Sequence, residues 1–151
     1  MKTSSRADID RLIAQPAIAV IGVSRSGKKF GNLACRELRA KGYRIYPIHP
    51  SAQVIGGFRC YARIADLPEP VDAALVVVPP AQALAVVCEV AAAGIHHVWL
   101  QQGAESSDVL KACHDLGLTF VWGECILMYA DPTGYHNAHR WLWRMLGKLA
   151  A

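Results

Sequence analysis

Several features that would assign a chain to a class at once are missing from this sequence. Its longest apolar run, residues 73–78, ends at Pro79 and is far too short to span a bilayer. The first eight residues contain no apolar stretch of the kind that a signal peptide needs. The five cysteines are odd in number and include no C-x-x-C pair, which predicts reduced thiols rather than a disulfide framework. We therefore expect a cytoplasmic protein that does not enter membranes.

Charge is also scarce. Only 19% of the residues are charged, and 16 basic and 12 acidic residues leave a net charge of +4. This excess is too small to predict nucleic-acid binding, although it suits an anionic small molecule. Hydrophobic residues make up 53% of the 151 residues, which predicts a single folded domain over residues 1–151.

Apolar strands alternate with helical segments along the chain. The pattern predicts five strands, at residues 17–23, 43–48, 71–78, 95–100 and 118–122. Helices are predicted before residue 16 and at residues 32–41, 81–93, 106–116 and 135–149. This alternation favours right-handed βαβ units, so we expect a three-layer, Rossmann-like α/β fold with a five-stranded parallel sheet flanked by helices.

The stretch between the second and third predicted strands has no clear period. Residues 51–67 are predicted to be irregular, with a turn at Gly56-Gly57 and a short edge segment at residues 59–61.

The end of the first predicted strand and the loop after it are the most informative part of the chain. The strand stops at Gly22, a polar loop follows, and a helical pattern begins near Phe30. A glycine-containing loop that leads into a helix suits a phosphate group, because backbone N–H groups and the helix dipole both favour an anion. The cations Arg25, Lys28 and Lys29 strengthen this prediction.

Two familiar nucleotide-binding motifs fit this loop only in part. Residues 22–28 match the start of a Walker A loop, but Lys29 stands where a magnesium-binding Ser or Thr is needed. Ser24 replaces the second glycine of G-x-G-x-x-G, and His49-Pro50-Ser51 follows the second strand in place of an acidic residue for the ribose 2′-hydroxyl. A nucleoside triphosphatase and an NAD enzyme are therefore not expected. NADP or coenzyme A, whose ribose is phosphorylated, fits better.

A series of short motifs follows in a fixed order. They are residues 19–24, residues 42–50, Gly56-Gly57, residues 64–68, Val71-Asp72, Val78-Pro79-Pro80, residues 99–103 and Cys125. In this order and spacing they resemble the CoA-binding domain family, a Rossmann-like module also found at the N-terminus of the succinyl-CoA synthetase alpha subunit. The resemblance extends from about residue 13 to residue 125.

The resemblance implies a site for coenzyme A or an acyl-CoA. The phosphates would contact Gly22, Ser24, Ser26 and Lys28, with Arg25 as a further cation, and Ile48, His49 and Pro50 would flank the adenine. Val78, Pro79 and Pro80 would line the ligand's path, and Gln102 and Gly103 would face the pantetheine arm. These residues all lie at the carboxyl ends of predicted strands, where ligands bind in such sheets.

Other features carry weaker predictions. Cys125, His136 and His139 form a loose zinc-ligand pattern without a fourth ligand, so ordinary packing is preferred. The acidic residue before Cys125 also argues against a reactive thiol that would bond to the CoA sulfur. His96-His97 is predicted to be an exposed turn pair. The aromatic and basic segment at residues 135–149 is predicted to cover the sheet or to pack a homodimer.

The sequence thus predicts a stand-alone CoA-binding or acyl-CoA-binding protein with a regulatory or carrier role. No nucleophile–base pair or carboxylate pair stands out at the predicted strand ends, so no catalysis is expected. The ligase activity of the synthetase is not expected either, because the chain ends soon after the matching residues. Two alternatives stay open, an NADP-linked oxidoreductase and a protein-interaction module that kept the fold without its ligand.

Overall fold

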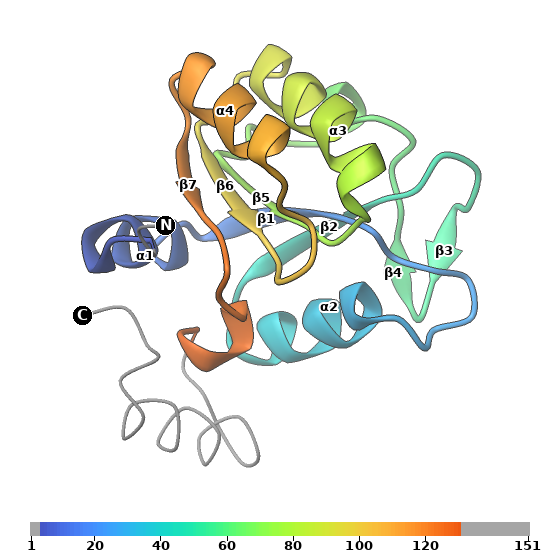
Figure 1. Cartoon of the computed structure of the whole chain (residues 1–151). Coiled ribbons are helices and arrows are strands. Elements are labelled where there is room, and N and C mark those ends of the chain that lie inside the picture. The colour runs from blue at the N-terminus through green and yellow to red at the C-terminus, as the bar shows by residue number, and fades with distance from the viewer. Residues whose placement is uncertain (1–3, 131–151) are drawn as a thin grey trace.

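The central feature of the molecule is a parallel sheet, shown in Figure 1 in a computed structural model that describes residues 4–130. The order of its five strands is β2-β1-β5-β6-β7. Their bounds are β1 Ala17–Ile21, β2 Arg44–Ile48, β5 Ala73–Val76, β6 His97–Leu100 and β7 Thr119–Val121. Because the order runs outwards from β1 on one side and from β5 on the other, the topological switch point lies between these two strands. The predicted Rossmann-like fold is confirmed.

Helices cover both faces of the sheet (Figure 1). α1 (Arg6–Ile13) and α2 (Phe30–Ala40) lie on one face, and α3 (Pro80–Ala92) and α4 (Ser107–Asp115) lie on the other. Successive residues of β1 therefore alternate between two cores: Ile18 packs with the helices of the first face, and Ala19 with those of the second. Burial on both faces explains why the strands are continuous apolar runs in the sequence.

The helices that follow β1 and β5 begin one or two residues before the predicted ranges. α2 starts at Phe30, where the loop analysis placed the beginning of the helical pattern, ahead of the predicted range of residues 32–41, and α3 starts at Pro80 rather than at residue 81. Proline suits the first helical position because its φ angle is already helical and its missing N–H has no helical partner there. The N-termini of α2 and α3 therefore lie next to the carboxyl ends of β1 and β5.

The stretch at residues 51–67 is more regular than predicted. It contains an antiparallel hairpin of β3 (Val54–Ile55) and β4 (Phe58–Arg59), followed by a single 3₁₀ turn, η1 (Ile64–Asp66). Gly56 and Gly57 form the hairpin turn with φ angles of 57° and 80°, as a type I′ turn requires. The Arg39 guanidinium of α2 lies 3.9 Å from the centroid of the Phe58 ring and attaches the hairpin to the helix.

The described part of the chain ends after a second 3₁₀ turn, η2 (Ile126–Met128). The helix predicted at residues 135–149, and with it His136 and His139, lies outside the described residues. Across residues 4–130, no helix combines the length and the apolar character needed to cross a bilayer.

Candidate functional site

Three backbone segments touch where the β1–α2 loop begins. Gly22 has a φ angle of +121°, and a Cβ atom there would lie 2.1 Å from the carbonyl oxygen of Val77. A Cβ atom on Gly31 would lie 2.5 Å from the carbonyl oxygen of Gly22. Neither position has room for a side chain, so the ends of β1 and β5 and the first turn of α2 meet backbone to backbone.

Asn32 holds the loop against α2, and the sequence did not single it out as a functional residue. Its buried side chain accepts a hydrogen bond from the Ser24 N–H at 3.0 Å and donates one to the Ser24 carbonyl at 2.9 Å. Asn32 shares the buried stripe of α2 with Cys35 and Leu38. A polar residue on an otherwise apolar stripe is the signal that could have identified it.

The two loop serines turn toward the loop's own backbone. The Ser26 N–H donates to Ser24 Oγ at 3.2 Å, and the Lys28 N–H donates to Ser26 Oγ at 3.3 Å. The Gly27 N–H donates to the Ser24 carbonyl at 3.0 Å. Most of the loop's amides therefore donate hydrogen bonds within the loop. These amides are not free to bind an anion, although the glycine spacing of the loop suggested that they would be.

Unpaired amides are found instead at the start of α2. Lys29 is the N-cap residue and makes no side-chain capping bond. Within residues 4–130, the N–H groups of Lys29, Phe30 and Gly31 have no hydrogen-bond acceptor. Together with the helix dipole they form a positive helix end, and the exposed side chains of Lys28 and Lys29 add two charges beside it.

The turn after β2 lies beside the β1–α2 loop and forms the other side of the site. His49 Nδ1 accepts hydrogen bonds from the N–H groups of Ser51, at 3.2 Å, and Ala52, at 3.0 Å. Because both neighbours donate to Nδ1, we assign the proton of the neutral ring to Nε2. Ile48 pairs with Tyr61, and the His49 N–H donates to the Tyr61 carbonyl at 2.9 Å, which fixes this turn on the sheet.

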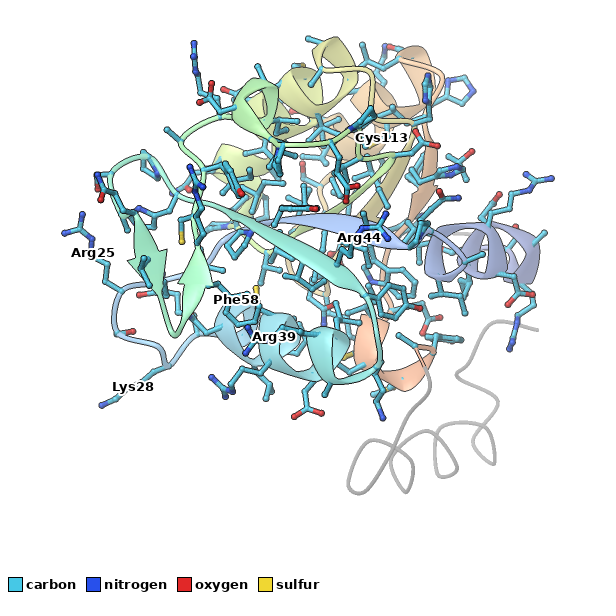
Figure 2. The ribbon with its side chains drawn as sticks, turned by 180° about the vertical axis from the view of Figure 1, so that it is seen from behind. Arg25, Lys28, Arg39, Arg44, Phe58 and Cys113 are labelled. Carbon is cyan, nitrogen blue, oxygen red and sulfur yellow. The ribbon has the colours of Figure 1, made fainter. Side chains whose placement is uncertain are left out.

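Arg25 connects the β1–α2 loop to the turn that follows β2. Its guanidinium donates to Ser51 Oγ at 2.9 Å. Figure 2 shows Arg25 reaching along the hairpin while Lys28 projects away from it. The loop cations that the sequence grouped together therefore separate, with Arg25 at the end of β2 and the lysines at the start of α2.

A narrow cleft lies between the loop, α2 and the hairpin. Its lining residues are Val23, Gly27, Asn32, Cys35, Arg36, Pro47, Ile55, Gly56 and Phe58. The cleft encloses about 30 Å³, which is room for water and not for a nucleotide. Burial raises the pKa of the Cys35 thiol to about 12, so this thiol is protonated at neutral pH. A large ligand would have to lie on the open edge of the sheet, outside this cleft.

The remaining predicted residues stand at the same carboxyl edge, behind β5 and β6. Val78 is half-buried, while Pro79 and Pro80 are exposed at the start of α3. Gln102 is exposed, and its side-chain amide donates to the Gly123 carbonyl at 3.1 Å. The Gly103 N–H donates to Glu105 Oε2 at 2.8 Å, so this amide already has a carboxylate as its acceptor.

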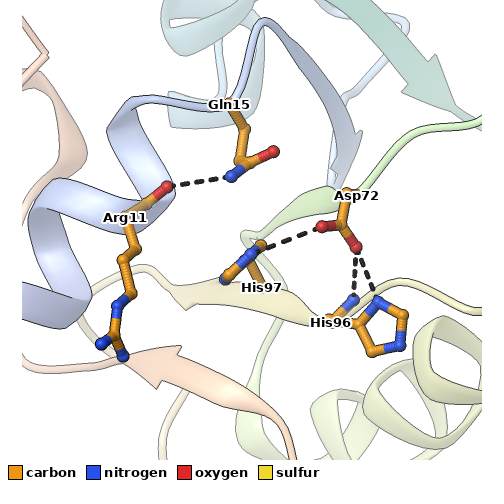
Figure 3. Close-up of polar contacts among 5 residues, drawn as sticks. All are labelled: Arg11, Gln15, Asp72, His96 and His97. Carbon is orange, nitrogen blue, oxygen red and sulfur yellow. Dashed lines mark hydrogen bonds and ion pairs between the residues drawn. The ribbon is translucent and has the colours of Figure 1, made fainter.

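The opposite edge of the sheet carries a separate polar cluster (Figure 3). Asp72 Oδ1 accepts from the backbone N–H of His96 and lies 2.8 Å from His96 Nδ1, and Asp72 Oδ2 lies 3.4 Å from His97 Nε2. The side chain of His97 is only 16% exposed, because this residue begins β6. The prediction of an exposed turn pair is therefore wrong for His97, although His96 is exposed.

Metal ligands are not assembled in the described part of the chain. No group of three His, Cys, Asp or Glu side chains between residues 4 and 130 could hold a metal ion. Cys125 is buried in the core beside η2, which keeps it away from any ligand on the open edge.

Comparisons with known proteins show the family and the fold of the chain. The sequence matches the family described as CoA binding domain over residues 16–131. An ADP-forming acetate–CoA ligase from Archaeoglobus fulgidus is 38% identical over 71 residues, which cover 47% of this chain and 10% of the ligase. The match thus spans about a tenth of the length of this ligase and 13% of the length of a second one from the same organism.

Two solved structures share the fold at higher coverage of this chain. A conserved hypothetical protein from Pyrococcus furiosus is 35% identical with a TM-score of 0.69, over 74% of this chain and 96% of that protein. A dinucleotide-forming acetyl-coenzyme A synthetase from Candidatus Korarchaeum cryptofilum, in complex with phosphate and ADP, is 30% identical with a TM-score of 0.64. That match covers 73% of this chain and 26% of the synthetase.

Proposed function

Because the chain belongs to the CoA-binding domain family, we propose that it binds coenzyme A or an acyl-CoA at the carboxyl edge of the sheet. The pyrophosphate would lie at the N-terminus of α2, and the adenosine would lie toward the end of β2. The bound thioester or thiol would serve regulation or delivery rather than a reaction catalysed by this domain.

The observation that carries the proposal is the positive, unpaired start of α2. Three consecutive amides without acceptors among the described residues face the loop, and two exposed lysines flank them. Backbone-to-backbone contact at Gly22 and Gly31 fixes the end of β1 and the first turn of α2 relative to each other, so the helix end has a defined position beside the carboxyl end of β1. A diphosphate group has the charge and the acceptor oxygens to match these donors.

The non-catalytic part of the proposal is supported by the chemistry of the groups nearby. The Cys35 thiol is held in its protonated form, and the Nδ1 atom of His49 is occupied by two backbone amides. Neither group is therefore available as a nucleophile or as a base on that nitrogen.

The test is a calorimetric titration of the whole chain with CoA, with NADP as a second ligand. Replacing Lys28 with Gln removes one cation beside the start of α2, and we expect CoA affinity to fall by roughly three- to tenfold, as for a partly screened charge contact. Lys111→Gln is the matched control, because Lys111 pairs with Asp115 on α4 and has no contact with the loop.

The alternatives give different results in the same experiment. Binding of NADP without binding of CoA would favour the oxidoreductase, and no heat with either ligand would favour an interaction module. If CoA binds and Lys28→Gln behaves like Lys111→Gln, the proposed position of the pyrophosphate is wrong.

A further inference from the structure

We propose that Arg25 and Ser51 form the subsite for the 3′-phosphate of coenzyme A and so distinguish CoA from dephospho-CoA. This inference rests on the proposed function and adds to it a preference for CoA over dephospho-CoA. The pair lies at the end of β2 and is distinct from the lysines that flank α2.

The topology places a ribose at this position. In sheets of this type a pyrophosphate at the first helix N-terminus puts the adenosine ribose beside the end of the neighbouring strand. An acidic residue there binds a free ribose hydroxyl, whereas an arginine accommodates a phosphate on the ribose. Here the neighbouring strand is β2, and residues 49–53 contain no carboxylate.

Among residues 4–130, no carboxylate pairs with the guanidinium of Arg25. Arg44 pairs with Glu69 at 2.7 Å and Arg63 pairs with Asp66 at 3.0 Å, so these two arginines each have a carboxylate partner. The hydrogen-bond partner of the Arg25 side chain within the described residues is the neutral hydroxyl of Ser51. An exposed guanidinium held in place without a counter-ion is suited to bind a phosphate dianion.

The neighbouring groups are donors as well. Ser51 Oγ accepts from Arg25, which leaves its own hydroxyl proton free to donate. His49 Nδ1 is occupied by backbone amides, so its Nε2–H is the donor of that ring. Arg25, Ser51 and His49 thus bring a cation and neutral donors, and no competing acceptor charge, to one turn.

The experiment compares the dissociation constants of CoA and dephospho-CoA for the full chain and for Arg25→Gln. We expect the unmodified protein to prefer CoA by roughly 10- to 100-fold, the range of a charge-assisted hydrogen bond. In Arg25→Gln, CoA affinity should fall by this factor while dephospho-CoA affinity changes little, so that the preference is lost. Ser51→Ala should reduce the preference by a smaller factor, because it removes one donor and the group that orients Arg25.

Arg11→Gln is the control, because Arg11 is an exposed arginine of α1 that pairs with Asp8. It should retain the full preference for CoA. The inference is overturned if both ligands bind and Arg25→Gln keeps the preference, a result that leaves the proposed function intact. Absence of CoA binding to the unmodified protein, or a preference for NADP over CoA, overturns the proposed function and this inference together.

Discussion

At the scale of single residues, Glu124 is a carboxyl group that the fold takes almost completely out of water. It is 1% exposed and lies between β7 and η2. The Tyr129 hydroxyl donates to its Oε2 atom at 3.0 Å. Burial raises the pKa of Glu124 because the charged form loses its hydration, and the hydrogen bond from Tyr129 opposes this effect only in part.

We therefore predict that Glu124→Gln stabilises the protein at neutral pH and has little effect in acid. A carboxyl group with a raised pKa contributes its full stability below its unfolded pKa, and this contribution is lost as the pH rises through the folded pKa. The gain at pH 7 should be about 1–3 kcal/mol, the range for an incompletely compensated buried charge. Chemical unfolding of both proteins between pH 4 and pH 8 measures it.

The control for this prediction is Glu89→Gln, since Glu89 is exposed on α3. Its difference from the unmodified protein should stay within about 0.5 kcal/mol across the same pH range. A Glu124→Gln protein whose stability follows the unmodified protein in parallel at every pH would show that the fold does not perturb this carboxyl group.

At the scale of elements, the long apolar segments were predictable and the short polar contacts were not. β1 is buried on both faces, so its residues form a recognisable apolar run, and the helix predicted from residue 81 is α3, which begins one residue earlier at Pro80. β3 and β4 have two residues each, which is too short for a periodic pattern, although Gly56-Gly57 identified their turn. The bond between Arg25 and Ser51 spans 26 positions in the sequence, and no local pattern encodes it.

The N-terminal segment and the edge strand β7 are joined by another contact of this kind. The Ser4 hydroxyl donates to the Trp122 carbonyl at 3.1 Å and accepts from the Trp122 N–H at 2.8 Å. Ser4 thus satisfies both backbone groups of Trp122, immediately beyond the last residue of β7, as a further strand would do.

We predict that Ser4→Ala lowers the free energy of unfolding by about 1–3 kcal/mol, because it leaves two partly buried backbone groups without partners. Thermal or urea unfolding measures the change. Ser107→Ala is the matched control, since Ser107 is exposed and its hydroxyl makes no hydrogen bond within the described residues; its effect should stay within about 0.5 kcal/mol. Equal effects of the two substitutions would show that the Ser4 contact does not stabilise the edge.

At the scale of the whole molecule, the two ends of the strands differ in chemistry. Within the part of the chain that the structure describes, the carboxyl edge carries amides without acceptors at residues 29–31 and cations without carboxylate partners at residues 25–29. The amino edge carries the Asp72 carboxylate, which already engages His96 and His97. The sequence located the carboxyl edge from its glycines and prolines, but it assigned Ser24 and Ser26 to the ligand when both serines also hold the loop.

This difference predicts how hydrogen exchange responds to CoA. A ligand that binds only the folded state at 100 times its dissociation constant adds about 2.7 kcal/mol to the free energy of unfolding. Core amides that exchange through global unfolding should therefore slow about 100-fold in every strand. Amides that exchange through local opening should slow only where the ligand contacts them, which we expect at residues 24–31 and 49–52.

The amides of residues 94–97 serve as the internal control, because they lie at the amino edge of the same sheet. Their local exchange should not change when CoA is added. Strong local protection there, without protection at Lys29, Phe30 and Gly31, would place the ligand at the amino ends of the strands and contradict the proposed site. Protection confined to the carboxyl edge would tie CoA binding to the start of α2, where the described amides lack partners in the free protein.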